Sequence, residues 1–120
     1  MTRPLVLVVD DDAGMRETLV EILEVAGLDS RAAADGEAAI SMLGAAHYDV
    51  VIMDVRLPGR DGVSILEEIG EPPPSVILIT AYAMEERLRA AVEAHAYAVL
   101  QKPFAAPYLL RLIEEAASAA

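Results

Sequence analysis

Short runs of apolar residues alternate along the chain with segments in which apolar residues recur at helical spacing. Residues 5–9, 50–53 and 76–79 are rich in β-branched side chains without polar alternation, which is typical of strands buried on both faces of a sheet. Residues 28–33 and 98–100 have the mixed or brief character of edge strands. The pattern predicts five βα units, and hence a parallel sheet with helices on both faces.

The segments that follow these runs each place their apolar residues on one helical face. These residues are Met15, Leu19, Ile22, Leu23 and Ala26; Ala39, Met42, Leu43 and Ala46; Val63, Leu66 and Ile69; Leu88, Ala91 and Val92; and Leu109, Leu112, Ile113 and Ala116. Gly27 is expected to end the first helix as a C-cap residue.

Composition narrows the class of protein. The 120 residues are the size of one domain, which we expect to span 1–120, and they include no cysteine, which excludes disulfides and thiolate metal sites. A net charge of −11 disfavours binding to phosphate backbones and anionic lipids, so we expect no direct nucleic-acid or membrane contact. There is no targeting segment and no apolar run long enough for a membrane span, which favours a cytoplasmic protein.

The unusual polar residues of the chain follow directly after predicted strands. Asp10 and Asp11 follow the first strand, Asp54 the third, Thr80 the fourth and Lys102 the fifth. Ligands of open α/β sheets bind at the carboxyl ends of the strands, where strand order reverses. The sequence therefore predicts a site at this edge of the sheet.

Carboxylates brought together at one sheet edge repel each other. A like-charged pair at ~4 Å costs about 4 kcal/mol at an effective dielectric constant near 20, so the acids either share protons or hold a hard cation. All-oxygen ligands suit Mg²⁺, with Mn²⁺ as a possible substitute. With Lys102, the only lysine, and the Thr80 hydroxyl, the group is typical of phosphoryl transfer to an aspartate nucleophile.

Four stretches of the chain together resemble the receiver domain of bacterial response regulators, which act in two-component phosphorelays. The stretches are Val8–Asp12, Ile52–Gly62, Ile79–Tyr82 and Gln101–Phe104, and they occur in order along essentially the whole chain. The resemblance implies a doubly wound, flavodoxin-like (βα)5 fold with strand order 2-1-3-4-5, as in the chemotaxis member of the family.

The resemblance also implies roles for the acidic residues. Asp54 would be the phosphoacceptor, taking a phosphoryl group from a sensor histidine kinase or phosphotransfer protein, or from a small donor such as acetyl phosphate. Asp11 would bind Mg²⁺ directly and Asp10 would act as a second acid, often through water. The backbone carbonyl of Arg56 would complete the protein ligands.

Further roles implied by the resemblance concern the switch. Thr80 would hydrogen-bond the phosphoryl group and move inward on activation, and Lys102 would pair with the same group, its peptide bond to Pro103 being cis. Phosphorylation would then change partner binding through the fourth helix, fifth strand and fifth helix. The protein would be a monomer or a phosphorylation-dependent dimer.

One departure from the family pattern concerns the aromatic switch residue. Val99 occupies the position, three before the lysine, where the family usually has an aromatic ring. Tyr97 or Tyr82 could replace this ring, or the output surface could signal without one. Tyr82 and Arg56 are also expected to flank the phosphoryl group and shield the phosphoaspartate from water.

Other polar residues have simpler interpretations. Asp12 is expected to cap the first helix rather than bind metal. Asp61-Gly62 and Asp35-Gly36 are expected to be turns and helix starts. His47 and His95 are expected to be solvated, with no catalytic role.

Three classes of function fit these residues to different degrees. The leading hypothesis is a phosphorylation-dependent switch that is not an enzyme in its own right. The second is an aspartate-nucleophile phosphatase, but Arg56 stands where that class has a second aspartate, and 120 residues leave no room for a cap domain. The third is a pseudo-receiver that only binds partners. The output stays open between a stand-alone relay protein and the N-terminal receiver of a larger transcription regulator.

Overall fold

The structure of the chain is a computed structural model, which describes residues 3–57, 60–69, 73–81, 89–90, 94 and 96–119. Its centre is a five-stranded parallel sheet with the order β2-β1-β3-β6-β7. These strands are β1 (Leu5–Val9), β2 (Asp29–Ala33), β3 (Val50–Asp54), β6 (Ser75–Thr80) and β7 (Ala98–Gln101). Because β6 and β7 are the fourth and fifth strands of this sheet, the predicted order 2-1-3-4-5 is confirmed.

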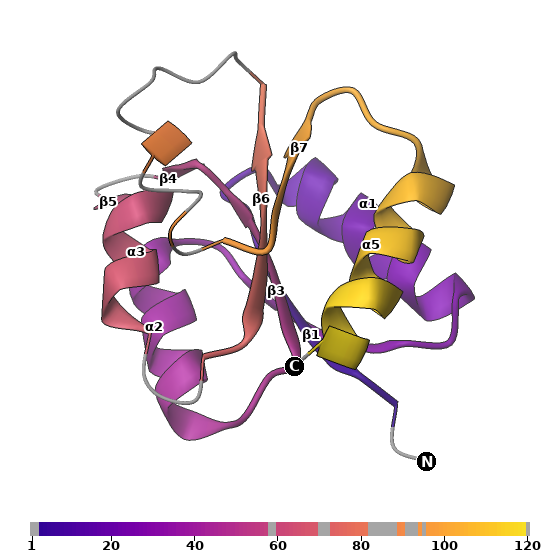
Figure 1. Cartoon of the computed structure of the whole chain (residues 1–120), viewed down its shortest axis with the longest axis horizontal. Helices are drawn as coiled ribbons and strands as arrows, with labels where there is room; N and C mark the ends of the chain where they lie inside the picture. Colours follow the sequence, from indigo (N-terminus) through magenta and orange to yellow (C-terminus); the bar gives the residue numbers. More distant parts are fainter. Residues whose placement is uncertain are drawn as a thin grey trace.

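Helices cover both faces of the sheet. The helices α1 (Ala13–Val25) and α5 (Ala106–Ala119) lie on one side, and α2 (Gly36–Ala45) and α3 (Gly62–Glu68) lie on the other (Figure 1). This arrangement confirms the doubly wound α/β fold. The predicted helical face with Leu88, Ala91 and Val92 falls outside the described residues. Within the described part of the chain, no helix combines the length and apolar character that a membrane crossing requires.

A short antiparallel ribbon interrupts the βα pattern after β3. It consists of β4 (Arg56–Leu57) and β5 (Arg60–Asp61), in which Arg56 is paired with Asp61. Two-residue strands are too short to produce a periodic signal, so the sequence pattern did not predict them. Helix α3 begins at Gly62, directly after β5, which confirms the helix start expected at Asp61-Gly62.

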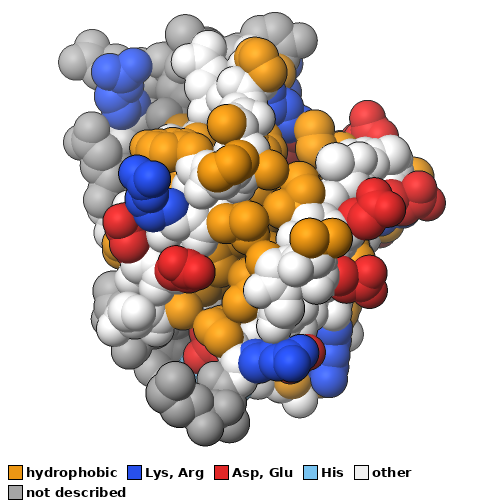
Figure 2. Space-filling model, turned by 90° about the vertical axis from the view of Figure 1, so that its right-hand side faces the viewer, with side chains coloured by type: hydrophobic (Ala, Val, Ile, Leu, Met, Phe, Trp, Pro, Cys, Tyr) orange, Lys and Arg blue, Asp and Glu red, His pale blue; other side chains and the backbone are white. Residues whose placement is uncertain are grey.

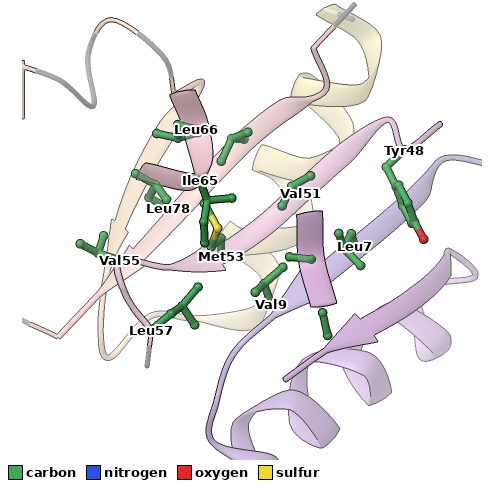
Figure 3. Packing of buried hydrophobic residues seen from close by; sticks show 13 residues of the cluster. Leu7, Val9, Tyr48, Val51, Met53, Val55, Leu57, Ile65, Leu66 and Leu78 are labelled. Atoms are coloured by element: carbon green, nitrogen blue, oxygen red, sulfur yellow. The ribbon is translucent and has the colours of Figure 1, made fainter. Parts of the chain in front are cut away.

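The strands bury alternate residues against the two helical layers, because successive side chains of a strand point to opposite faces. Leu7, Val51 and Leu78 pack on the side of α2 and α3, where Figure 3 shows the cluster. Val8 and Ile52 pack into the second cluster, on the side of α1 and α5. Burial on both faces explains why these strands are apolar without alternation.

Two buried residues lie outside the apolar faces that the periodicity predicts. Tyr48 is only 2% exposed and lies at one end of the cluster in Figure 3, with its hydroxyl directed away from it. The guanidinium of Arg31 lies 6.0 Å from the centre of its ring, within reach of a cation–π interaction. Ile65 is fully buried beside Leu66, because two neighbouring positions of the short helix α3 both face the core.

Aspartates begin the helices where the sequence predicts them. The Oδ1 atom of Asp12 accepts hydrogen bonds from the amides of Gly14 and Met15, at 2.9 and 3.2 Å. Asp35 accepts in the same way from the third residue beyond it, which confirms it as a helix entrance. Gly27 follows α1 with a φ of 79°, a conformation that glycine adopts without a steric penalty.

Asp49 ties together the starts of three strands. Its amide donates to the carbonyl of Leu5 at 2.9 Å, and its Oδ2 accepts from the amide of Leu5 at 2.8 Å. Its own carbonyl accepts from the amide of Ser75 at 3.1 Å. The Nε2 atom of His47 lies 3.8 Å from Asp49 Oδ1 in this exposed region, a pairing that the sequence did not indicate.

The first prediction concerns the stability that Asp49 provides. Asp49→Ala leaves the Leu5 amide without its side-chain partner, so we expect the free energy of unfolding to fall by about 1–3 kcal/mol. Urea denaturation followed by circular dichroism measures this loss. Asp29→Ala, at an exposed position of β2, is the matched control and should change stability by less than about 0.5 kcal/mol. Equal effects of both substitutions would contradict the role of Asp49.

Candidate functional site

The candidate residues converge because the strands end level with one another. Asp10 follows β1 directly, Asp54 ends β3, Thr80 ends β6 and Lys102 follows β7. The pairing continues past the strand ends: the amide of Lys102 donates to the carbonyl of Thr80 at 2.8 Å. Backbone register alone therefore places these four residues at one edge of the sheet.

The ammonium group of Lys102 lies between two carboxylates. Its Nζ donates to Asp54 Oδ2 at 2.9 Å and lies 3.8 Å from Asp10 Oδ2. The Asp10 and Asp54 side chains are 2% and 14% exposed, and the lysine side chain is 23% exposed. The Lys102–Pro103 peptide bond is cis, as the resemblance implied. The only lysine in the chain thus places its positive charge beside Asp10, which is almost completely buried.

Burial shifts the pKa of Asp10 and the pKa of Lys102 in opposite directions. Burial raises the pKa of Asp10, with further increases from Asp54 and Asp11, although the Asp12 amide and Lys102 oppose the shift. Burial lowers the pKa of Lys102, but its hydrogen bond to Asp54 and the nearby negative charges outweigh this effect and leave its pKa raised. Without a further cation, the site therefore favours one charged lysine and resists ionisation of Asp10.

The second oxygen of each carboxylate is held by backbone two residues further along the chain. Asp10 Oδ1 accepts from the amide of Asp12 at 2.9 Å, and Asp54 Oδ1 accepts from the amide of Arg56 at 2.8 Å. These are the local side-chain to backbone contacts that aspartate favours in turns. They leave the Oδ2 atoms of both residues directed to Lys102.

The remaining predicted site residues lie around this centre. Thr80 is buried, with 7% exposure, at the end of β6. Asp11 is exposed and lies close enough to raise the pKa of Asp10 by charge repulsion. Arg56 lies in β4 with an exposed side chain and contacts Asp54 through its backbone amide. Tyr82, expected to shield the site, lies outside the described residues.

The donor set fits a hard divalent cation bound by few protein ligands. In the described parts of the chain, no three acidic or histidine side chains are already gathered as a metal cluster. Mg²⁺, however, usually keeps several waters and takes only one or two carboxylates together with substrate phosphate. Asp10 and Asp54 both lie within 4 Å of one ammonium group, so their oxygens face the same part of the sheet edge.

The register of β7 bears on the missing aromatic ring. The amide of Tyr97 donates to the carbonyl of Val76, four residues before Thr80 along β6. At roughly 3.3 Å per residue, this offset of four residues places the backbone of Tyr97 about 13 Å from that of Thr80 along the strand direction. The distance disfavours Tyr97 as a partner of Thr80. Tyr97 and Val99 are 42% and 37% exposed. Tyr82, the other candidate for this ring, lies outside the described residues.

An apolar groove of about 470 Å³ adjoins the site between α1 and the start of α5. Figure 2 looks onto this face and shows a band of hydrophobic side chains down its centre, with acidic and basic side chains on both sides of the band. The groove, called the α1–α5 groove below, is lined by Met15, Thr18, Leu19, Ile22, Lys102, Pro103, Phe104 and Ala106. Lys102 therefore belongs both to the carboxylate site and to the groove.

One contact at the site could not be predicted from the sequence pattern. The Nη1 atom of Arg16, in the first turns of α1, donates to the backbone carbonyl of Asp10 at 2.8 Å. An arginine in an amphipathic helix normally indicates a solvated face, and a bond to a carbonyl six residues earlier is visible only in three dimensions.

Comparison with known proteins gives one family. The family described as the response regulator receiver domain matches residues 6–114. The DNA-binding transcriptional regulator NtrC of Salmonella typhimurium is 34% identical over 98% of this chain, which spans 26% of its length. The transcriptional regulatory protein PdtaR of Mycobacterium tuberculosis is 35% identical over 94% of the chain, which spans 56% of its length.

Solved structures agree with this result. A CheY-like response regulator receiver domain protein from Methanospirillum hungatei has a TM-score of 0.91 at 27% identity, covering 98% of this chain and 96% of its own. A receiver domain protein from Clostridium thermocellum has a TM-score of 0.89 at 27% identity, covering 97% and 95%. Both chains are similar to this one along nearly their full lengths.

The second prediction follows from the raised pKa of Asp10. The folded state binds the Asp10 proton more tightly than the unfolded state, so stability falls as pH rises from the ordinary value of 3.8 through the folded pKa. Asp10→Asn removes the buried charge and keeps an oxygen for the Asp12 amide. In the presence of a metal chelator at pH 7, we expect this variant to unfold at a higher urea concentration than the wild type.

The gain should disappear below about pH 3, where Asp10 is protonated in both states. The exposed substitution Asp29→Asn serves as the control for a simple change of net charge. An Asp10→Asn variant that is less stable at neutral pH would show that the Lys102 contact outweighs the cost of burial.

Proposed function

Because the chain belongs to the response regulator receiver domain family, we propose that it is switched by transfer of a phosphoryl group to Asp54 from a sensor histidine kinase or phosphotransfer protein. The observation that carries this proposal is the 2.9 Å contact between Lys102 Nζ and Asp54 Oδ2, beside the buried Asp10. A carboxylate at the rim of the sheet, with a fixed cation at its side, suits attack on an anionic phosphorus centre.

The transfer needs a nucleophile, a leaving group and neutralisation of charge. An oxygen of Asp54 forms the new O–P bond, while the N–P bond of a phosphohistidine breaks and its electron pair returns to the imidazole. With acetyl phosphate the breaking bond is O–P and acetate leaves. Lys102 and the Thr80 hydroxyl stabilise the charge on the phosphoryl oxygens.

We further propose that the carboxylates of Asp10, Asp11 and Asp54 and the backbone carbonyl of Arg56 hold Mg²⁺, or Mn²⁺ in its place. Support comes from the oxygen-only donors and from the unfavourable ionisation of Asp10 without a further cation. A divalent ion bound there supplies positive charge to the transferring phosphoryl group. Lys102 is expected to release Asp10 and stay with the phosphorylated Asp54.

The response to phosphorylation is proposed to be a shift between two conformations of the output face. Thr80 would move toward the phosphoryl group and bias the surface formed by β7, α5 and the segment before β7. This surface would change its affinity for partners or for a second copy of the chain, which is otherwise a monomer. We take residues 1–120 as one receiver unit that acts in the cytoplasm.

The output is proposed in two forms. NtrC and PdtaR are named as transcriptional regulators, and the chain spans 26% and 56% of their lengths. The chain is therefore either a relay protein or the N-terminal receiver of a larger regulator of this kind. In both forms the net charge of −11 argues against direct contact between residues 1–120 and nucleic acid.

The α1–α5 groove suits the phosphodonor protein. A helix of a histidine-bearing partner can lay apolar side chains along Met15, Ile22 and Phe104 and bring its phosphohistidine to the edge that Lys102 shares with the site. Small donors need no such contact. Phosphorylation by the two kinds of donor should therefore respond differently to changes in the groove.

The third prediction tests the phosphoacceptor. Incubation with acetyl phosphate and Mg²⁺ should add the mass of one phosphoryl group to the intact protein, and Asp54→Asn should abolish this adduct because an amide is a poor nucleophile. The substitution Asp29→Asn, on exposed β2, should leave the adduct unchanged. An adduct that persists in Asp54→Asn, or Mg²⁺ binding and adduct both absent from the wild type, would refute the proposal.

The fourth prediction tests the groove. Ile22→Arg places a charge among the apolar groove residues and should lower kcat/KM for transfer from the phosphorylated kinase more than about tenfold. Its rate with acetyl phosphate should stay at the wild-type value. Val25→Arg makes the same change three residues away, at a side chain that is 88% exposed and outside the groove. Equal loss with both variants, or with both donors, would contradict groove docking.

A further inference from the structure

A side chain from helix α1 reaches back to the acidic turn in front of the helix. Arg16 is half-buried in the first turns of the helix, and its Nη1 atom donates to the carbonyl of Asp10 at 2.8 Å. This bond goes to a backbone oxygen and not to a carboxylate. Its contact with the site is therefore a contact with the backbone.

The carbonyl of Asp10 needs such a partner because it lies just beyond the sheet. The pairing of β1 with both of its neighbours ends at Val9, and the amide of Asp10 makes one last bond to the carbonyl of Ala33 at 3.2 Å. The chain then turns away toward α1. A half-buried carbonyl at this point would lose a hydrogen bond without Arg16.

The turn that follows, residues 10–12, is fixed by four other hydrogen bonds. Asp12 donates its amide to Asp10 Oδ1, accepts from the amides of Gly14 and Met15 through its side chain, and accepts from the amide of Arg16 through its carbonyl. Arg16 thus donates hydrogen bonds to both ends of the turn: its amide to the carbonyl of Asp12 and its side chain to the carbonyl of Asp10. The turn and the first turns of α1 form one hydrogen-bonded unit.

We propose that Arg16 is a positioning residue for the divalent-cation site, which holds the turn 10–12 in the conformation that presents Asp10 and Asp11 to the same cation as Asp54. This inference rests on the proposed function, because it assumes that these acids bind Mg²⁺. Partners that orient metal ligands without touching the metal commonly change metal affinity by about 10–100-fold when they are removed.

Two effects of the arginine have opposite signs, which makes the inference testable. If Arg16 acts by positioning, its removal disorders the turn and weakens Mg²⁺ binding. If it acts only as a nearby positive charge, its removal relieves repulsion of the cation and strengthens Mg²⁺ binding. If it only stabilises the fold, the affinity of the folded protein for Mg²⁺ does not change.

The first experiment measures Mg²⁺ affinity by isothermal titration calorimetry on the full chain. Arg16→Ala should raise the Kd for Mg²⁺ about tenfold, and Arg16→Lys should recover part of the loss because an ammonium group can donate to the same carbonyl. Arg111→Ala, an exposed position of α5, removes the same charge and should leave the Kd unchanged. An unchanged or lower Kd in Arg16→Ala would overturn the proposal.

The second experiment needs no metal. In chelator, amide hydrogen exchange followed by NMR should show faster exchange of the Asp12 amide, which is bonded to Asp10 Oδ1, in Arg16→Ala than in the wild type. The amides of the central strand β3 should keep their protection, which separates loss of the turn from loss of the fold. Equal protection of the Asp12 amide in both proteins would also overturn the proposal.

The acetyl phosphate reaction links the two results. Arg16→Ala should need about tenfold more Mg²⁺ for half-maximal phosphorylation but should reach the wild-type maximum at saturation, as expected when only cation binding is impaired. A lower maximum at saturating Mg²⁺ would place Arg16 in the transfer step and contradict a positioning role. A wild type that binds no Mg²⁺ would refute the proposed function, while the metal-free exchange would still test the contact with Asp10.

Discussion

The contact between Lys102 and the carboxylates of Asp54 and Asp10 is the interaction on which the candidate site depends. Two acids brought to one edge by parallel strands repel each other, and one of them is almost completely buried. A single ammonium at 2.9 and 3.8 Å compensates both only in part, because the pKa of Asp10 is still raised by its burial. The site is thus built with more negative charge than its own lysine can balance.

This excess of negative charge lowers the stability of the folded state at neutral pH, and it also favours binding of a cation. The fold can carry a buried, poorly compensated aspartate because the strands on either side of it are fixed elsewhere. Asp49 ties the opposite ends of β1, β3 and β6, and both faces of the sheet are covered by apolar side chains. A cation bound there, as proposed above, would offset this excess negative charge, and its binding energy could then favour one conformation of the site over another.

Most of the fold and the membership of the site could be predicted from the sequence, for a reason visible in β1 and β3. Their unbroken apolar character reports burial on both faces, and the parallel sheet then brings the polar residues after them, Asp10 and Asp54, to one edge without any knowledge of packing. The ribbon of β4 and β5 could not be predicted, because it is too short to show a period. Tyr48 and Arg16 could not be predicted either, because a tyrosine in a loop and an arginine in a helix gain their roles only from neighbours distant in sequence.

The segment that begins at Lys102 connects three parts of the molecule: the end of β7, the carboxylate site and the α1–α5 groove. The amide of Lys102 extends the pairing of β7 with β6 at Thr80, its ammonium contacts Asp54, and Pro103 and Phe104 after it line the α1–α5 groove. Phosphorylation of Asp54, as proposed above, would draw the ammonium toward the phosphoryl group and would act on the end of β7 and on the groove through a few covalent bonds. Coupling over so short a path needs no long chain of contacts through the core, only a backbone at residues 102–104 whose position depends on the charge it faces.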